Sequence, residues 1–212
     1  MVVVTVDTGL TPDSELLAVT AGQRLLLEHT GPWTVEDWWS LPAMTHGRRY
    51  EVVQGTLVIS STPDLDHAWA VHTLRRILER AAPTLMAVEV VGFTTEDSAL
   101  VPDLQLVSQT LVRTSSARSL TGDDVALVVE VQSRSSRGYD RLVKAEVYAE
   151  AGVPRYWHVD PQGPTVHAGV LRDGAYVEEA EADPDGVLRV DLEHGGERWR
   201  VELHLADLVR IG

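Results

Sequence analysis

The stretch Val125-Ala126-Leu127-Val128-Val129-Glu130-Val131-Gln132 decides the fold of this 212-residue chain. Its almost uninterrupted apolar side chains are typical of a strand covered on both faces, so we expect it at the centre of a sheet. Because side chains alternate along a strand, Glu130 shares a face with Val128 and Gln132. A carboxylate inside such a strand is costly unless something pairs with it, and a bound cation is one such partner.

A second isolated acid lies in the strand predicted just before this one, from Leu100 to Val107. Asp103 follows Pro102 and is the one acid among apolar neighbours in Val101-Pro102-Asp103-Leu104. Two acids on adjacent strands can form a divalent cation site, since Mg²⁺ needs only one or two carboxylates besides water and substrate phosphate. A metal there would lower the pKa of a bound water and stabilise charge on a phosphoryl group.

The only lysine of the chain, Lys144, lies in a helix predicted from about Tyr139 to Ala151, and all 17 other basic residues are arginines. Lys144 lies four residues after Asp140 and four before Tyr148, so the three side chains share one helical stripe. An ammonium group near the two acids would orient the water and stabilise developing charge. We therefore expect the Lys144 ammonium within a few ångströms of both carboxylates, in a cleft.

Each of these residues also has a simpler interpretation. Glu130 could be neutralised by a buried arginine, and Asp103 could merely cap a turn. Asp140 and Lys144 could be an ordinary helix ion pair worth about 0.2–0.5 kcal/mol. The combination of two isolated acids on apolar strands with a sole lysine on the next helix favours a site.

The rest of the pattern predicts a mixed α/β (α+β) domain. A short helix begins at Thr34, which forms a capping box with Asp37, and ends before Pro42. Gly152 is expected to end the helix of Lys144. A hairpin over 49–53 and 56–60 turns at Gln54-Gly55, and a helix covers 64–81. Further strands are expected over 85–93, 155–159, 165–171, 175–179, 187–192 and 198–203.

We divide the chain into an N-terminal arm, 1–33, and one domain, 34–212. The domain has a core at about 46–161 and an antiparallel β extension at 162–212, which extends the sheet or covers an edge.

Composition excludes several function classes. The chain contains no cysteine, which removes thiolate zinc sites and cysteine nucleophiles. No segment has the length and apolar character of a membrane span, and we expect a cytoplasmic protein. The net charge of −14 argues against a protein that coats nucleic acid, but residues 101–160 carry only −1, so an anion could approach there.

The order of these motifs is similar to the Uma-type putative restriction endonuclease family of the PD-(D/E)xK nuclease superfamily. The resemblance covers roughly residues 34 to 180, and its most diagnostic segment is Gly152 to Pro161. It rests on Tyr50-Glu51-Val52-Val53-Gln54-Gly55, the helix near His67, Pro102-Asp103, Val129-Glu130-Val131 with Ser133 and Ser135, Asp140-x-x-x-Lys144-x-x-x-Tyr148, and Gly152-Val153-Pro154-Arg155-Tyr156-Trp157-His158-Val159-Asp160-Pro161.

The resemblance implies a restriction-endonuclease-like fold, a mixed sheet flanked by helices. It also implies Mg²⁺, or Mn²⁺, as the metal and hydrolysis of DNA phosphodiester bonds as the reaction. By position Asp103 is the aspartate of the PD motif and Glu130 the acid of (D/E)xK, both metal ligands. Gln132 replaces the expected lysine at a catalytic position and cannot donate an ammonium, a role that passes to Lys144 on the following helix.

Two further positions complete the implied site. Glu51 matches an early family glutamate that completes the site or holds a second metal, and Val131 is the remaining metal-site position. His67 is a weaker candidate, because a packed or solvent-facing helix histidine is the more common case.

Three functions remain open. In the first, a DNA endonuclease, Arg134, Arg137 and Arg141 meet the phosphate backbone, although they could equally be a solvated loop and helix start. In the second, the fold has lost catalysis and serves as a binding or assembly module, which Gln132 and the acidic charge favour. The third is a metal-dependent phosphoesterase acting on smaller substrates. A homodimer is plausible for cutting both strands of a duplex.

Overall fold

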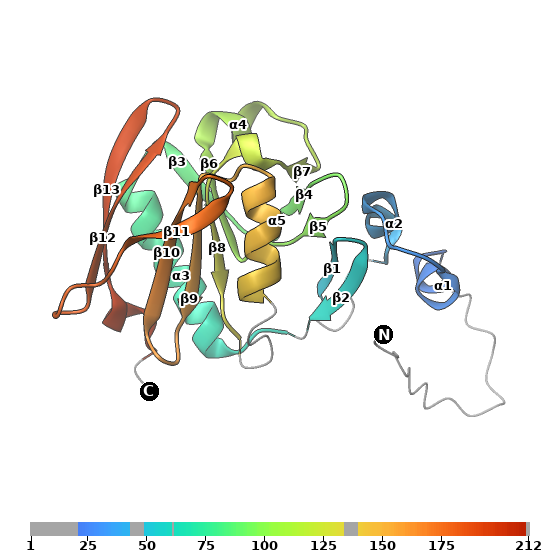
Figure 1. Ribbon diagram of the computed structural model, residues 1–212, viewed down its shortest axis with the longest axis horizontal. Coiled ribbons are helices and arrows are strands. Elements are labelled where there is room, and N and C mark those ends of the chain that lie inside the picture. Colours follow the sequence, from blue (N-terminus) through green and yellow to red (C-terminus); the bar gives the residue numbers. More distant parts are fainter. Residues whose placement is uncertain (1–20, 43–48, 61, 134–139, 211–212) are drawn as a thin grey trace.

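The main sheet of the computed structural model has six strands in the order β11-β10-β9-β8-β6-β3 (Figure 1). The structure describes residues 21–42, 49–60, 62–133 and 140–210. At the centre is β8 (Val125–Val131), all seven residues of which are buried, as the apolar run predicted. It pairs in parallel with β9 (Arg155–Asp160) and antiparallel with β6 (Leu104–Ser108). The sheet is therefore mixed.

A second, smaller sheet has the order β2-β1-β5-β4-β7. Its hairpin of β1 (Arg49–Val53) and β2 (Thr56–Ser60) pairs in the predicted register, with Val53 opposite Thr56. The turn needs positive φ at both central residues, 45° at Gln54 and 76° at Gly55, which glycine adopts without strain. The hairpin prediction is confirmed, and β1 brings Glu51 toward the main sheet.

Two predicted strands are each split in two, which corrects the sequence interpretation. The expected strand 85–93 is β3 (Leu85–Val88) and β4 (Gly92–Thr94), and the expected strand 100–107 is β5 (Ala99–Leu100) and β6. Val90 has a φ of 61°, outside strand geometry, and Pro102 has no N–H to give to a ladder. At each break the chain crosses between the two sheets, and Asp103 lies at the second break.

Helices α3 (Leu65–Ala81) and α5 (Ala145–Glu150) cover opposite faces of the main sheet (Figure 1). Leu127, Val129 and Val131 of β8 belong to the core cluster of α3. Val128 belongs to the second cluster, which contains Val147 and Tyr148 of α5. Glu130 therefore lies on the α5 face of the sheet.

The predicted helix around Lys144 is confirmed from residue 140 onward but is not uniform. A π-helical turn, η2 (Asp140–Lys144), runs into α5, and such turns are frequent at functional sites. Its end is a Schellman motif, in which the N–H of Val153 donates to the carbonyl of Tyr148 and that of Gly152 to the carbonyl of Ala149. Gly152 has the positive φ, 78°, that this cap requires.

The β extension has two parts. The hairpin of β10 (Thr165–Arg172) and β11 (Ala175–Ala180) extends the main sheet beyond β9. The hairpin of β12 (Val187–His194) and β13 (Glu197–His204) forms a separate sheet whose buried residues belong to the core cluster of α3. The remaining elements are α1 (Ala21–Glu28), α2 (Val35–Ser40), α4 (Gln109–Thr114), β7 (Ser119–Leu120), η1 (Gly122–Asp124) and η3 (Leu205–Leu208).

Candidate functional site

Lys144 reaches two carboxylates in the interior of the molecule. Its Nζ lies 2.9 Å from Oε1 of Glu51 and 3.2 Å from Oε1 of Glu130. Lys144 is 2% exposed, Glu51 1% and Glu130 4%. Charges this deep are stable only when paired, and removing one partner leaves the other as an uncompensated buried charge.

Tyr148 makes the second contact to Glu130. Its hydroxyl donates to Oε1 of Glu130 at 2.7 Å, so one oxygen accepts from both Lys144 and Tyr148. The two donors lie four residues apart, so the predicted stripe occurs for this pair. Burial, then the nearby charges of Glu130 and Glu51, raise the pKa of Tyr148 well above its usual value, so its hydroxyl stays a neutral donor.

Asp103 has its own set of donors. Its Oδ1 accepts from Nη1 of Arg49 at 3.0 Å, and its Oδ2 contacts Nε2 of His67 at 3.0 Å and accepts from the Val131 amide at 2.8 Å. Burial alone would raise the pKa of Asp103. The contacts of His67, Arg49 and the Val131 amide outweigh it and lower this pKa from 3.8 to about 2.

The hairpin strand β1 contributes two side chains to this cluster. Arg49 and Glu51 are two residues apart on β1 and share one face. Glu51 Oε1 accepts from the Val101 amide at 2.8 Å, and Arg49 Nη1 donates to the Val101 carbonyl at 2.8 Å. Burial lowers the pKa of Arg49, but the charges of Asp103, Glu51 and Glu130 raise it overall.

Strand register brings the two predicted metal ligands together. Leu104 pairs with Val129 across the antiparallel β6–β8 ladder, and one further step along it brings Asp103 level with Glu130. The bond from the Val131 amide to Asp103 holds this alignment. The acids that we singled out from the sequence, Asp103, Glu130 and Glu51, therefore lie in one buried cluster with Lys144.

The expected surroundings of Lys144 need one correction. We expected its ammonium beside Asp103 and Glu130 in a cleft. It contacts Glu130, but its second carboxylate is that of Glu51, and Asp103 is held by Arg49 and His67. The three carboxylates are buried rather than lining an open cleft.

The other predicted positions have different outcomes. Gln132 follows β8, and its amide donates to Oδ2 of Asp160 at 3.2 Å. Val131 contributes its amide to Asp103. Arg134 and Arg137 lie outside the described residues, as do the side chains of Asp140 and Arg141.

Sequence reasoning gives His67 little weight and does not point to Arg49. His67 is a packed helix histidine, 6% exposed, and it also contacts the buried acid Asp103. Asp64 caps α3 by accepting from the His67 amide, which fixes this residue in the first turn. The available signal for Arg49 was its i,i+2 spacing from Glu51 on a predicted strand.

The donor set fits a hard divalent cation. Carboxylate oxygens are the ligands that Mg²⁺ prefers, and one or two carboxylates suffice when water and substrate phosphate supply the rest. In the part of the chain that the structure describes, no three or more histidine and acidic side chains are arranged to hold a metal. Asp103 and Glu130 are the two carboxylates that the sequence predicted as metal ligands, and Asp103 directly precedes β6, the strand that pairs with the β8 strand of Glu130. No helix in the described ranges is long and apolar enough to cross a membrane.

Comparisons with known proteins identify the fold and the family of the chain. The chain resembles the crystal structure of a putative nuclease belonging to DUF820 from Anabaena variabilis, with a TM-score of 0.65 and 16% identity. The match covers 84% of this chain and 97% of that one, which shows that the two chains share a fold. No curated protein matches the sequence. The family model Uma2, described as "Putative restriction endonuclease", matches residues 35–203, and the chain belongs to this family.

Proposed function

We propose that this protein is a metal-dependent nuclease that hydrolyses DNA phosphodiester bonds at the cluster of Asp103, Glu130 and Lys144. The observation that carries the proposal is the buried Lys144 ammonium, which lies 3.2 Å from Oε1 of Glu130. Glu130 is on β8, which pairs with β6, the strand that begins just after Asp103. A fold of the restriction endonuclease type and membership of the Uma2 family support it.

Asp103 and Glu130 would hold Mg²⁺, with Glu51 and the backbone of Val131 as the further positions at the site. The bound metal would supply a water of lowered pKa and a counter-charge for the phosphoryl oxygens. Among the described residues, Lys144 and Arg49 are basic side chains that contact these carboxylates, and a divalent cation bound by Asp103 and Glu130 would add further positive charge to the cluster.

The residues of the chain have separate tasks in this proposal. Lys144 orients the attacking water and stabilises charge that develops on the phosphate, as preorganised cations do in phosphoryl transfer. Glu51 holds the ammonium in place, and Tyr148 keeps the Glu130 carboxylate oriented. Arg49 and His67 are positioning residues that fix Asp103 in its ionised form.

The test is cleavage of plasmid and single-stranded DNA with Mg²⁺ or Mn²⁺ by the wild type, Asp103→Ala and Lys144→Ala. We expect cleavage by the wild type and a loss of at least 100-fold in both variants, with folding checked by circular dichroism. Equal cleavage by all three proteins would contradict the mechanism and indicate a contaminating nuclease. The same assay on p-nitrophenyl phosphate esters tests for a phosphoesterase of smaller substrates.

One observation favours a second candidate, a nuclease fold that binds without cutting. The lysine expected on β8 is Gln132, whose amide bonds Asp160. DNA binding by the wild type without cleavage under any of these metals would establish this alternative.

A further inference from the structure

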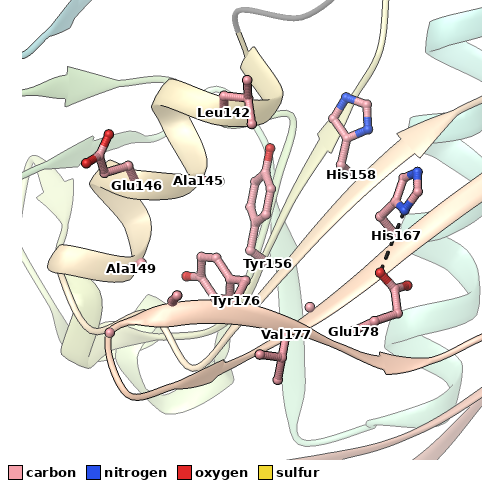
Figure 2. A pocket seen from close by; sticks show the side chains of 13 residues that line it. Leu142, Ala145, Glu146, Ala149, Tyr156, His158, His167, Tyr176, Val177 and Glu178 are labelled. Atoms are coloured by element: carbon pink, nitrogen blue, oxygen red, sulfur yellow. Dashed lines mark ion pairs between the residues drawn. The ribbon is translucent and has the colours of Figure 1, made fainter.

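A cavity of about 410 Å³ lies between α5 and strands β9, β10 and β11 (Figure 2). We call it the α5–β10 pocket and define it by Leu142, Tyr156, His158, His167, Tyr176 and Glu178. The size is in the range of pockets that bind small molecules, and apolar and aromatic walls with a few polar groups are typical of them. None of the site residues described above lines this pocket.

The pocket begins one strand away from the proposed site. In the parallel β8–β9 ladder Glu130 pairs with His158, and in the antiparallel β9–β10 ladder His158 pairs with His167. The ring of Tyr148, which bonds Glu130, lies 5.5 Å from that of Tyr156 in the pocket. The pocket and the proposed site are therefore neighbours on the same sheet, joined through the β8–β9 pairing and the Tyr148–Tyr156 contact.

The floor of the pocket is aromatic. The rings of Tyr156 and Tyr176 lie 5.4 Å apart at 33°, and Figure 2 shows Tyr156 beside His158 with Tyr176 next to it. Gly169 lets Tyr176 pack closely over β10, because a Cβ there would lie 3.0 Å from Cβ of Tyr176. The rim carries two exposed apolar side chains, Leu142 at 73% and Val177 at 46%.

The polar groups select the kind of ligand. Glu178 lines the pocket with a carboxylate, which repels a phosphate group. A carboxylate accepts from the exocyclic amino groups of bases, and aromatic rings stack on a base of any kind. His167 lies 3.7 Å from Glu178 and adds a second hydrogen-bonding group beside it. The chemistry therefore suits a planar base with an amino donor and not an anion.

We propose that the α5–β10 pocket is a subsite for one unstacked nucleobase of the substrate, next to the proposed metal site of Asp103 and Glu130. This inference rests on the proposed nuclease function. A base paired inside a duplex cannot enter a pocket, so the substrate is single-stranded DNA or a duplex with an extruded base. The enzyme then recognises a structural feature of DNA rather than an intact duplex sequence.

The test uses a pentathymidylate with one central 2-aminopurine, whose fluorescence falls when the base stacks on an aromatic ring. The full-length protein is titrated in EDTA, so that binding is measured without metal or cleavage. We expect the fluorescence to fall and the affinity to drop at least tenfold for the double variant Leu142→Ala/Glu178→Gln. The matched control Leu65→Ala/Glu181→Gln changes two equally exposed types of residue outside the pocket and should bind within twofold of the wild type.

Each outcome decides between the claims. The proposal that the pocket binds a base would be overturned by any of three results: no binding, unchanged fluorescence on binding, or equal affinities of the two double variants. An abasic nucleotide in place of 2-aminopurine should weaken binding at least tenfold, and equal binding would also overturn it. Cleavage of DNA without pocket-dependent binding defeats this inference alone, whereas pocket-dependent binding without metal-dependent cleavage supports the pocket and defeats the nuclease proposal.

Discussion

Lys144 and Glu51 are 93 residues apart in the chain, yet the ammonium nitrogen of one lies 2.9 Å from a carboxylate oxygen of the other. The pair joins η2, next to the main sheet, to β1 of the second sheet. The ion pair therefore ties β1 to η2 and holds the Lys144 ammonium in place.

Removal of the ammonium should destabilise the fold. Lys144→Met leaves Glu51 and Glu130 buried without it, and we expect a loss of about 3–5 kcal/mol in the free energy of unfolding. In a Glu51→Gln background the same substitution should cost less, with a coupling of about 0.5–3 kcal/mol. Urea unfolding of the four proteins measures this, and strictly additive losses would show that the pair is not coupled.

Two tyrosines allow a comparison of charged and neutral acceptors. The Tyr148 hydroxyl donates to a carboxylate, whereas that of Tyr176 donates to the Val153 carbonyl at 2.8 Å. Tyr148→Phe should cost about 1.5–3 kcal/mol and Tyr176→Phe about 0.5–1.5 kcal/mol in the free energy of unfolding. Thermal or urea unfolding checks the order, and a larger loss for Tyr176→Phe would contradict it.

The lowered pKa of Asp103 predicts acid sensitivity. The folded-state pKa is about 2 against an ordinary 3.8, so the stabilisation is fully present above pH 4 and is lost as the pH falls through about 2. It amounts to about 2 kcal/mol. Asp103→Asn should remove this part of the pH dependence of unfolding between pH 4 and 2. An unchanged slope in that range would show that Asp103 is not specifically stabilised as a carboxylate.

Gly122, outside the site, lets the chain pack closely against the C-terminal end of α5. A Cβ on Gly122 would lie 1.7 Å from the carbonyl oxygen of Ala151, at the end of α5. Gly122→Ala should therefore cost at least about 1–3 kcal/mol of stability. Gly163→Ala is the control, because its Cβ would meet nothing nearer than Asp160 Oδ2 at 3.8 Å. Equal melting temperatures of the two variants would contradict the close approach.

Gln132 tests the proposed move of the lysine to the helix. Its amide bonds Asp160, so Gln132→Ala should reduce DNA cleavage less than tenfold, whereas Lys144→Met should abolish it. Rates on one labelled oligonucleotide with Mg²⁺ measure both. A greater loss of cleavage in Gln132→Ala than in Lys144→Met would show that residue 132, and not Lys144, is essential for cleavage.

The elements that local patterns specify were predictable from the sequence. The apolar run of β8, the alternation and turn of the β1–β2 hairpin, and the capping box of α2 each depend on neighbours within a few residues. The breaks at Val90 and Pro102 were not predicted, although Pro102 itself argues against an uninterrupted central strand. These breaks arise because the chain changes sheets, which is a tertiary feature.

The same limit applies to the candidate site. The burial cost of an acid in an apolar strand pointed to Asp103 and Glu130, and uniqueness pointed to Lys144. The partners of Asp103 were not evident, because Arg49 and His67 lie 54 and 36 residues from it in the chain. Only the packing of β1 and α3 against the main sheet brings them together.

The most direct test of the nuclease site is a single-turnover comparison of the wild type with Glu130→Gln. This substitution keeps the shape of the side chain and removes its negative charge. With enzyme in excess over a labelled single-stranded oligonucleotide and saturating Mg²⁺, we expect the cleavage rate to fall at least 100-fold in a variant that is folded by circular dichroism. Equal rates for the two folded proteins would contradict a role for this cluster in phosphodiester hydrolysis.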